Sequence, residues 1–182
     1  MKVLTAILVL IFSLQSWTKA DDISEFEIEG MYIGESLLKY MSIDEIKNDL
    51  KEHINWLHTD KKFQRVENYK GPYENYDYVA STIKPDDPEY KIYGLSGMLD
   101  INDPDKCNNL KQEIQSSLKS TFKNAEIQNW EDSLRQDPSG KSMAVGTEFY
   151  LANGSASVVC YNFTEESNIK SGLDVSISNK EF

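Results

Sequence analysis

Residues that bind anions or metals are scarce in this 182-residue chain. It has two arginines, two histidines and two cysteines, and its net charge is −11. Arginine supplies the bidentate clamps that hold phosphate and carboxylate groups, so few sites of that kind can form. A strongly acidic surface also repels phosphate backbones and anionic lipid headgroups. We therefore expect no nucleic-acid partner.

Long apolar runs are absent beyond residue 14, which excludes a later membrane span because a span takes roughly 20 apolar residues. Residues 1–20 are typical of a secretory signal peptide. Lys2 precedes an apolar run over 3–14, and Thr18-Lys19-Ala20 places small residues where signal peptidase cleaves. An uncleaved N-terminal anchor is the alternative. No lipid-attachment cysteine follows, so we expect no stable membrane anchor after signal cleavage.

The mature chain is predicted to be a single domain of residues 21–182, periplasmic or secreted. Its 162 residues suffice for a hydrophobic core. Loss of Lys2 and Lys19 with the signal peptide brings its net charge to −13. No internal repeat or low-complexity tract divides it.

Helices are expected mainly in the first two thirds of the chain. A short one covers 34–41. A second begins after Ser42, where Glu45 completes a capping box, and its apolar residues recur at helical spacing to about residue 58. A third begins at Asp103-Pro104, an N-cap residue followed by proline at the first helical position.

Strands are expected between these helices and over the last third of the chain. The β-rich runs are 76–84, 90–101, 142–151, 155–163 and 173–178, with 63–66 as a candidate short strand. Asn153-Gly154 between two such runs predicts a hairpin with a type I′ turn. Residues 124–140 fit no element, apart from a turn at their end. We therefore predict an α+β fold, an antiparallel sheet of about five strands with two to three helices packed on one face.

The two cysteines, Cys107 and Cys160, are expected to form a disulfide because the chain is predicted to be exported. Pairing Ala152 with Ser155 across the hairpin puts Cys160 on the apolar face with Phe149, and Cys107 lies on the apolar stripe of the third helix. The bond would close a loop of about 54 residues, worth roughly 4 kcal/mol from chain entropy. Two buried free thiols are the alternative. No histidine or other cysteine lies near either one at the spacing of a metal site, so metal binding is not expected.

The sequence suggests no catalytic constellation. His53 and His58, on the second predicted helix, lie about 140° apart around its axis and share no face. Residues 100–105 are similar to a calcium loop, but the sixth-position glycine and the distal glutamate are missing. Asp103 serves better there as a helix cap. We expect no metal and no cofactor, and we lean against an enzyme.

Tyrosines gather between residues 69 and 93. We nominate Tyr76, Tyr78, Tyr90 and Tyr93 as a candidate binding surface, because rows of aromatic rings can grip sugars or peptides. The alternative is that these tyrosines form cross-strand pairs that cover a sheet face.

Several strings of the sequence resemble small exported proteins of Pelagibacter-type marine bacteria. They are 26–42, Tyr90-Lys-Ile-Tyr-Gly-Leu-Ser-Gly97, Gly140-Lys-Ser142, Asn153-Gly-Ser-Ala156 and Ser178-Asn-Lys-Glu-Phe182. The resemblance covers nearly the whole mature chain and implies no activity and no site residue. The start at 30–34 is also similar to small envelope modules of the outer-membrane assembly lipoprotein type, whose lipid-anchoring cysteine this chain lacks.

The sequence thus predicts an exported, non-catalytic binding or interaction module of the bacterial envelope, with an unknown protein or glycan as its partner. Two alternatives stay open. One is a hydrolase that acts on envelope or exported polymers. The other is an inhibitor or assembly factor for another envelope protein.

Overall fold

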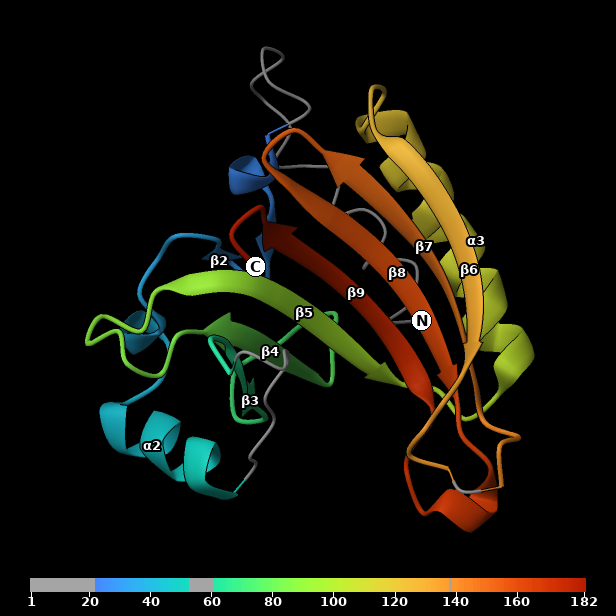
Figure 1. Ribbon diagram of the computed structural model, residues 1–182, viewed down its shortest axis with the longest axis horizontal. Coiled ribbons are helices and arrows are strands. Elements are labelled where there is room, and N and C mark those ends of the chain that lie inside the picture. The colour runs from blue at the N-terminus through green and yellow to red at the C-terminus, as the bar shows by residue number, and fades with distance from the viewer. Residues whose placement is uncertain (1–21, 53–60, 138) are drawn as a thin grey trace.

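One twisted antiparallel sheet forms the body of the protein (Figure 1). The computed structural model describes residues 22–52, 61–137 and 139–182. Along the sheet the strand order is β3-β4-β5-β9-β8-β7-β6. Its strands are β3 (Gln64–Asn68), β4 (Tyr78–Ile83), β5 (Ile92–Asp100), β6 (Glu126–Ser133), β7 (Met143–Leu151), β8 (Gly154–Asn162) and β9 (Gly172–Asn179). A second, two-stranded sheet pairs β1 (Glu27–Ile28) with β2 (Met31–Tyr32).

The prediction of about five strands with two to three helices on one face is wrong. The described residues form a seven-stranded and a two-stranded sheet, with two α-helices, α2 (Ile43–Glu52) and α3 (Pro104–Thr121). In the large sheet the unexpected strand is β6, inside the range 124–140 that fitted no element, and the two short strands β1 and β2 were not predicted either. Most of its side chains are exposed, so it lacks the alternating apolar pattern by which strands are recognised.

Three short 3₁₀ helices also occur among the described residues. They are η1 (Ile23–Glu25), η2 (Leu37–Lys39) and η3 (Glu165–Ser167). The helix predicted over 34–41 is therefore a single turn, η2. None of the described helices combines the length and the apolar character that a membrane crossing requires.

Helix α3 packs against β8 and β9 on one face of the sheet, and Figure 1 shows it in olive behind β6 and β7. Its start is confirmed, because the Asp103 carboxylate accepts hydrogen bonds from the N–H groups of Asp105 and Lys106. The predicted disulfide is confirmed too. Cys107 of α3 and Cys160 of β8 are bonded, with their Cα atoms 5.9 Å apart. The bond attaches the helix to the core face of the sheet.

Helix α2 packs against β3, an edge strand of the sheet. The backbone N–H of Glu67 donates to Asp49 Oδ2 at 3.2 Å, so the helix covers part of the strand edge. Its capping box is confirmed, since Glu45 accepts from the backbone N–H and the hydroxyl of Ser42. His53 and His58 lie outside the described residues.

The β7–β8 hairpin forms where it was predicted but in another register. Leu151 pairs with Gly154, whereas the prediction paired Ala152 with Ser155. A shift of two residues in the pairing leaves every side chain on its own face, because side chains alternate with period two. Cys160 therefore still faces the core.

Asn153 and Gly154 do not form the predicted type I′ turn. Each instead makes a specific contact with a neighbouring part of the chain. Neither Asn153 nor Gly154 is among the described residues with positive φ. A Cβ on Gly154 would lie 2.1 Å from the carbonyl oxygen of Ser178, so only glycine fits beside β9. The Asn153 side chain accepts from the N–H of Ile23 at 3.3 Å and donates to Asp22 Oδ1 at 2.5 Å. It thereby ties the first described residues to the sheet.

Candidate functional site

The face of the sheet opposite α3, called here the open face, is polar where the core face is apolar. Two adjacent cross-strand pairs near its middle are all serine. The hydroxyls of Ser155 and Ser178 lie 2.9 Å apart, and those of Ser157 and Ser176 lie 2.7 Å apart. Within each pair the two hydroxyls satisfy each other's hydrogen bonding.

One row of directly paired residues crosses the open face over six strands. Its members are Tyr78, Met98, Asp174, Val159, Gly146 and Trp130. Tyr69 extends the row, because its ring stacks on that of Tyr78 with centroids 4.4 Å apart. Two buried atoms of the row, Asp174 Oδ1 and Trp130 Nε1, have no hydrogen-bond partner among the described residues. A buried polar atom of this kind calls for an explanation.

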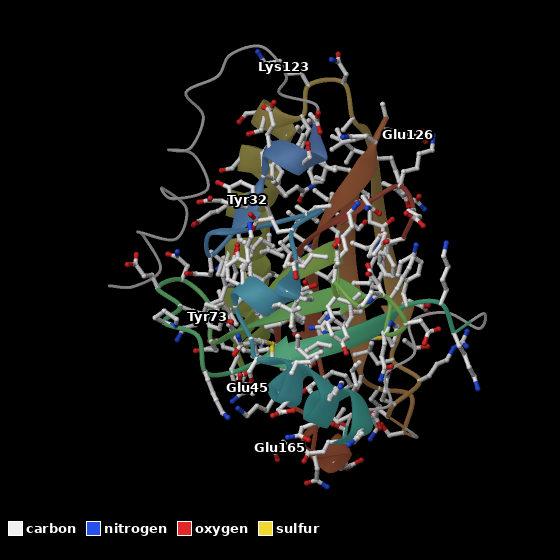
Figure 2. All side chains as sticks on the ribbon, turned by 90° about the vertical axis from the view of Figure 1, so that its left-hand side faces the viewer. Tyr32, Glu45, Tyr73, Lys123, Glu126 and Glu165 are labelled. Carbon is white, nitrogen blue, oxygen red and sulfur yellow. A yellow bond between two sulfur atoms is a disulfide. The ribbon has the colours of Figure 1, made fainter. Side chains whose placement is uncertain are left out.

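A cleft of about 520 Å³ opens at one end of this face, and we call it the open-face cleft. Strands β3, β4, β5, β8 and β9 and the loops that follow β6 and β8 line it. Glu165, labelled at the lower end of Figure 2, belongs to the β8–β9 loop that borders the cleft. The side chains that line the cleft include Arg65, Glu67, Tyr69, Tyr78, Met98, Asp100, Tyr161, Phe163, Ile169, Lys170 and Asp174.

One arginine faces two carboxylates in this cleft. Arg65 Nε lies 3.2 Å from Glu67 Oε1, and Arg65 Nη1 lies 3.9 Å from Asp174 Oδ2. Asp174 is only 7% exposed. Burial raises the pKa of its carboxyl group, and the charge of Arg65 and the hydroxyl of Ser96 oppose that rise. The triad carries a formal charge of −1.

The walls of the cleft are held by hydrogen bonds between two loops. The Asp137 carboxylate accepts from the hydroxyls of Ser139, Ser142 and Thr164 at 2.7, 2.5 and 3.0 Å, and from the backbone N–H of Ser139 and Ser142. These donors, led by Ser142, hold the pKa of Asp137 far below its usual range. The β6–β7 loop is thus fastened to the β8–β9 loop.

The four nominated tyrosines occupy different places. Tyr78 lines the cleft. Tyr76 lies against Gly97 and packs on the core. Tyr90 and Tyr93 are each 6% exposed, Tyr90 in the main core and Tyr93 edge-on to Phe63 at 5.2 Å.

Tyr69 and Tyr161 line the cleft and were not nominated from the sequence. A signal for Tyr161 was present, because it follows Cys160 in a strand and must face away from the core. Figure 2 places Tyr73, another of the clustered tyrosines, on the side of the sheet that carries α3.

Within the described residues, no group of three or more His, Cys, Asp or Glu side chains could hold a metal ion. Comparison of the chain with protein-family models, with curated proteins and with solved structures finds no match. The resemblance to exported proteins of Pelagibacter-type bacteria therefore stays a prediction. Function has to be inferred from the cleft itself.

Proposed function

We propose that this protein is an exported binding module of the bacterial envelope and that the open-face cleft is its binding site. The observation that carries the proposal is Asp174, a carboxylate 7% exposed on the cleft floor, one oxygen of which has no partner among the described residues. Binding sites commonly join a few such polar groups to apolar and aromatic walls. Here the walls include Tyr69, Tyr78 and Phe163.

Rigid walls support the same proposal. Asp137 fastens the two loops, and Ser171 bridges the backbone of Phe163, accepting from its N–H at 2.8 Å and donating to its C=O at 3.3 Å. A preformed site binds more tightly because less order has to be imposed on binding.

The state of the polar groups favours binding over hydrolysis. Arg65 engages Glu67, and Lys170 is ion-paired with Asp100 at the cleft. A general base has to lie within hydrogen-bond reach of the proton that it removes, free to accept it. Glu67 and Asp100 already have cationic partners, so of the three cleft carboxylates only Asp174 keeps a buried oxygen without a partner among the described residues, whereas glycoside hydrolysis takes two carboxyl groups.

Export is supported by the disulfide and by the predicted signal peptide over 1–20. Disulfides persist mainly in oxidising compartments such as the periplasm. The bond between Cys107 and Cys160 joins α3 to β8 deep in the fold. A periplasmic or secreted location is therefore part of the proposal.

A site-specific photocrosslink tests the binding site. Ile169 in the cleft and Ile43 on α2 are 42% and 44% exposed, so they form a matched pair. With a photoreactive residue at each position in turn, we expect a discrete adduct in native periplasmic extract from position 169 and none from 43. Mass spectrometry identifies the adduct. Equal labelling at both positions, or none at 169, would contradict the proposal.

A further inference from the structure

We propose that the open-face cleft binds a protonated aliphatic amine, with the Asp174 carboxylate as the acceptor of its ammonium group. The inference rests on the proposed function, because it names the ligand chemistry of the same cleft. Lysine side chains and free diamines share that chemistry.

The charges in the cleft do not balance. Arg65 supplies one positive charge to two carboxylates, those of Glu67 and Asp174, and Lys170 is already ion-paired with Asp100. One negative charge thus remains uncompensated in a site where Asp174 is nearly buried. A buried charge without a full partner is unfavourable, so a cationic ligand would stabilise this arrangement. The chain's net charge of −11 attracts such a ligand from a distance.

The hydrogen bonding of Asp174 calls for a donor. Although the Ser96 hydroxyl acts on this carboxyl group, its Oδ1 atom is buried and has no hydrogen-bond partner among the described residues, while Oδ2 faces Arg65. An ammonium group carries three N–H donors and the missing positive charge. A neutral hydroxyl would supply a donor and leave the charge unbalanced.

The walls suit an alkyl chain that ends in a cation. Burial, and after it the charge of Asp174, raises the pKa of Tyr161, so this phenol lies within the field of the carboxylate. Tyrosine rings attract cations through their π faces. Met98 and Ile169 offer apolar surface for methylene groups. The cleft volume of about 520 Å³ leaves room for the molecule that carries the amine.

An NMR titration of the isotope-labelled, disulfide-bonded protein purified from the periplasm tests this. The probes are pentylammonium, the neutral alcohol pentan-1-ol, which has the same number of non-hydrogen atoms, and methyl glucoside as a sugar. We expect shifts confined to amides that line the cleft and an affinity for pentylammonium about tenfold above that for pentan-1-ol. Two further probes then distinguish the source of the amine. Nα-acetyl-lysine methylamide, whose side-chain amine is free, stands for a lysine side chain, and cadaverine stands for a free diamine.

Substitutions give the sign of each contribution. Asp174→Asn keeps the shape and removes the charge, so it should weaken pentylammonium binding about tenfold. Asp86→Asn, in the β4–β5 turn away from the cleft, is the charge-matched control and should change nothing. Arg65→Gln removes the positive charge that faces Glu67 and Asp174, so it should tighten the binding of an ammonium ion. If the natural ligand were an anion, the same substitution would abolish its binding.

Exposed tyrosines provide a second test should a buried substitution unfold the protein. Tyr69→Ala in the cleft should weaken pentylammonium binding, and Tyr150→Ala, outside the cleft lining, should not.

Equal affinity for ammonium and alcohol, or an unchanged affinity in Asp174→Asn, would overturn the inference. Shifts with methyl glucoside and none with pentylammonium would overturn it too, and leave the binding module intact. Absence of shifts with every probe, together with no crosslink at position 169, would reject both proposals.

Discussion

At several glycines of the sheet, the position that a Cβ atom would take is crowded, either by an aromatic ring or by neighbouring backbone. Aromatic rings lie over Gly97 and Gly146, where a Cβ would come within 2.6 Å of Tyr76 and 2.4 Å of Trp130. A ring can shift to relieve such a contact. At Gly154 the neighbour is the backbone of β9, which is held in the sheet. We therefore expect Gly154 to tolerate substitution least.

Gly154→Ala should lower the free energy of unfolding by about 1–3 kcal/mol, the usual result of overpacking. Urea denaturation measures it. Gly140→Ala serves as the comparison, because nothing lies within 4 Å of its Cβ position and only its φ of 69° opposes the side chain. A Gly154→Ala protein as stable as the wild type would show that β9 can move away.

Acid should loosen the loops at the cleft through Asp137. Hydrogen bonds, first from Ser142 and then from Ser139, lower the pKa of Asp137 in the folded protein below its value in the unfolded chain, which is about 3.9. The contribution to stability is then complete above pH 4 and is lost as the pH falls through the folded pKa.

Asp137→Asn should therefore lower the melting temperature most at neutral pH. The difference from the wild type should shrink between pH 4 and pH 2. Thermal unfolding by circular dichroism at several pH values measures this, with Asp86→Asn, the same substitution at an exposed turn residue, measured alongside as the control. A difference that does not depend on pH would mean that the carboxylate charge plays no part.

At the scale of elements, the disulfide should contribute much of the stability. Cys107 and Cys160 are 53 residues apart in the chain, and closing such a loop is worth about 4 kcal/mol from chain entropy. We expect that loss on reduction, measured by urea denaturation with and without reductant. Alkylation of the unfolded, unreduced protein should modify neither cysteine. Modification of both would refute the bond.

Elements with local signals were predictable, and those without were not. Helix starts at Ser42 and Asp103 follow from side chains that bond nearby backbone groups, so a short stretch of sequence suffices. Strand β6 has no such signal, because both of its faces are largely exposed. It forms because Trp130 lies over Gly146 of β7 and because the two strands pair along eight residues.

For the whole molecule, one apolar core joins nearly every element. Buried side chains of η1, α2, α3 and the core face of the sheet form a single cluster, which includes Ile23, Ile46, Ile114 and Val158. The small sheet contributes Ile28 and Met31 to the same cluster. A chain with one continuous core is expected to unfold as a unit.

Thermal unfolding should therefore be a single transition. We expect far-ultraviolet circular dichroism, which follows the sheet, and near-ultraviolet circular dichroism, which follows aromatic packing, to give the same midpoint. An earlier near-ultraviolet transition would mean that aromatic packing at the cleft is lost before the sheet. It would also argue against a preformed binding site.

The candidate site shows the limit of prediction by sequence. Tyr78 could be nominated because tyrosines gather in that stretch. Nothing local connects Arg65 with Asp174, which lie on β3 and β9 with two strands between them. Because Asp174 alternates with apolar residues, the pattern predicts a solvent-exposed side chain. In the structure it is nearly buried on the open face.

The sequence by itself determined the features that depend on nearest neighbours along the chain. These are the helix caps, the alternation of β9, and the facing of Cys160 toward Cys107, because side-chain direction follows from period and spacing. Only the tertiary structure decided the hairpin register, the place of β6 and the charge imbalance in the cleft. Each depends on which distant strands lie side by side, and that is set by packing over the whole core.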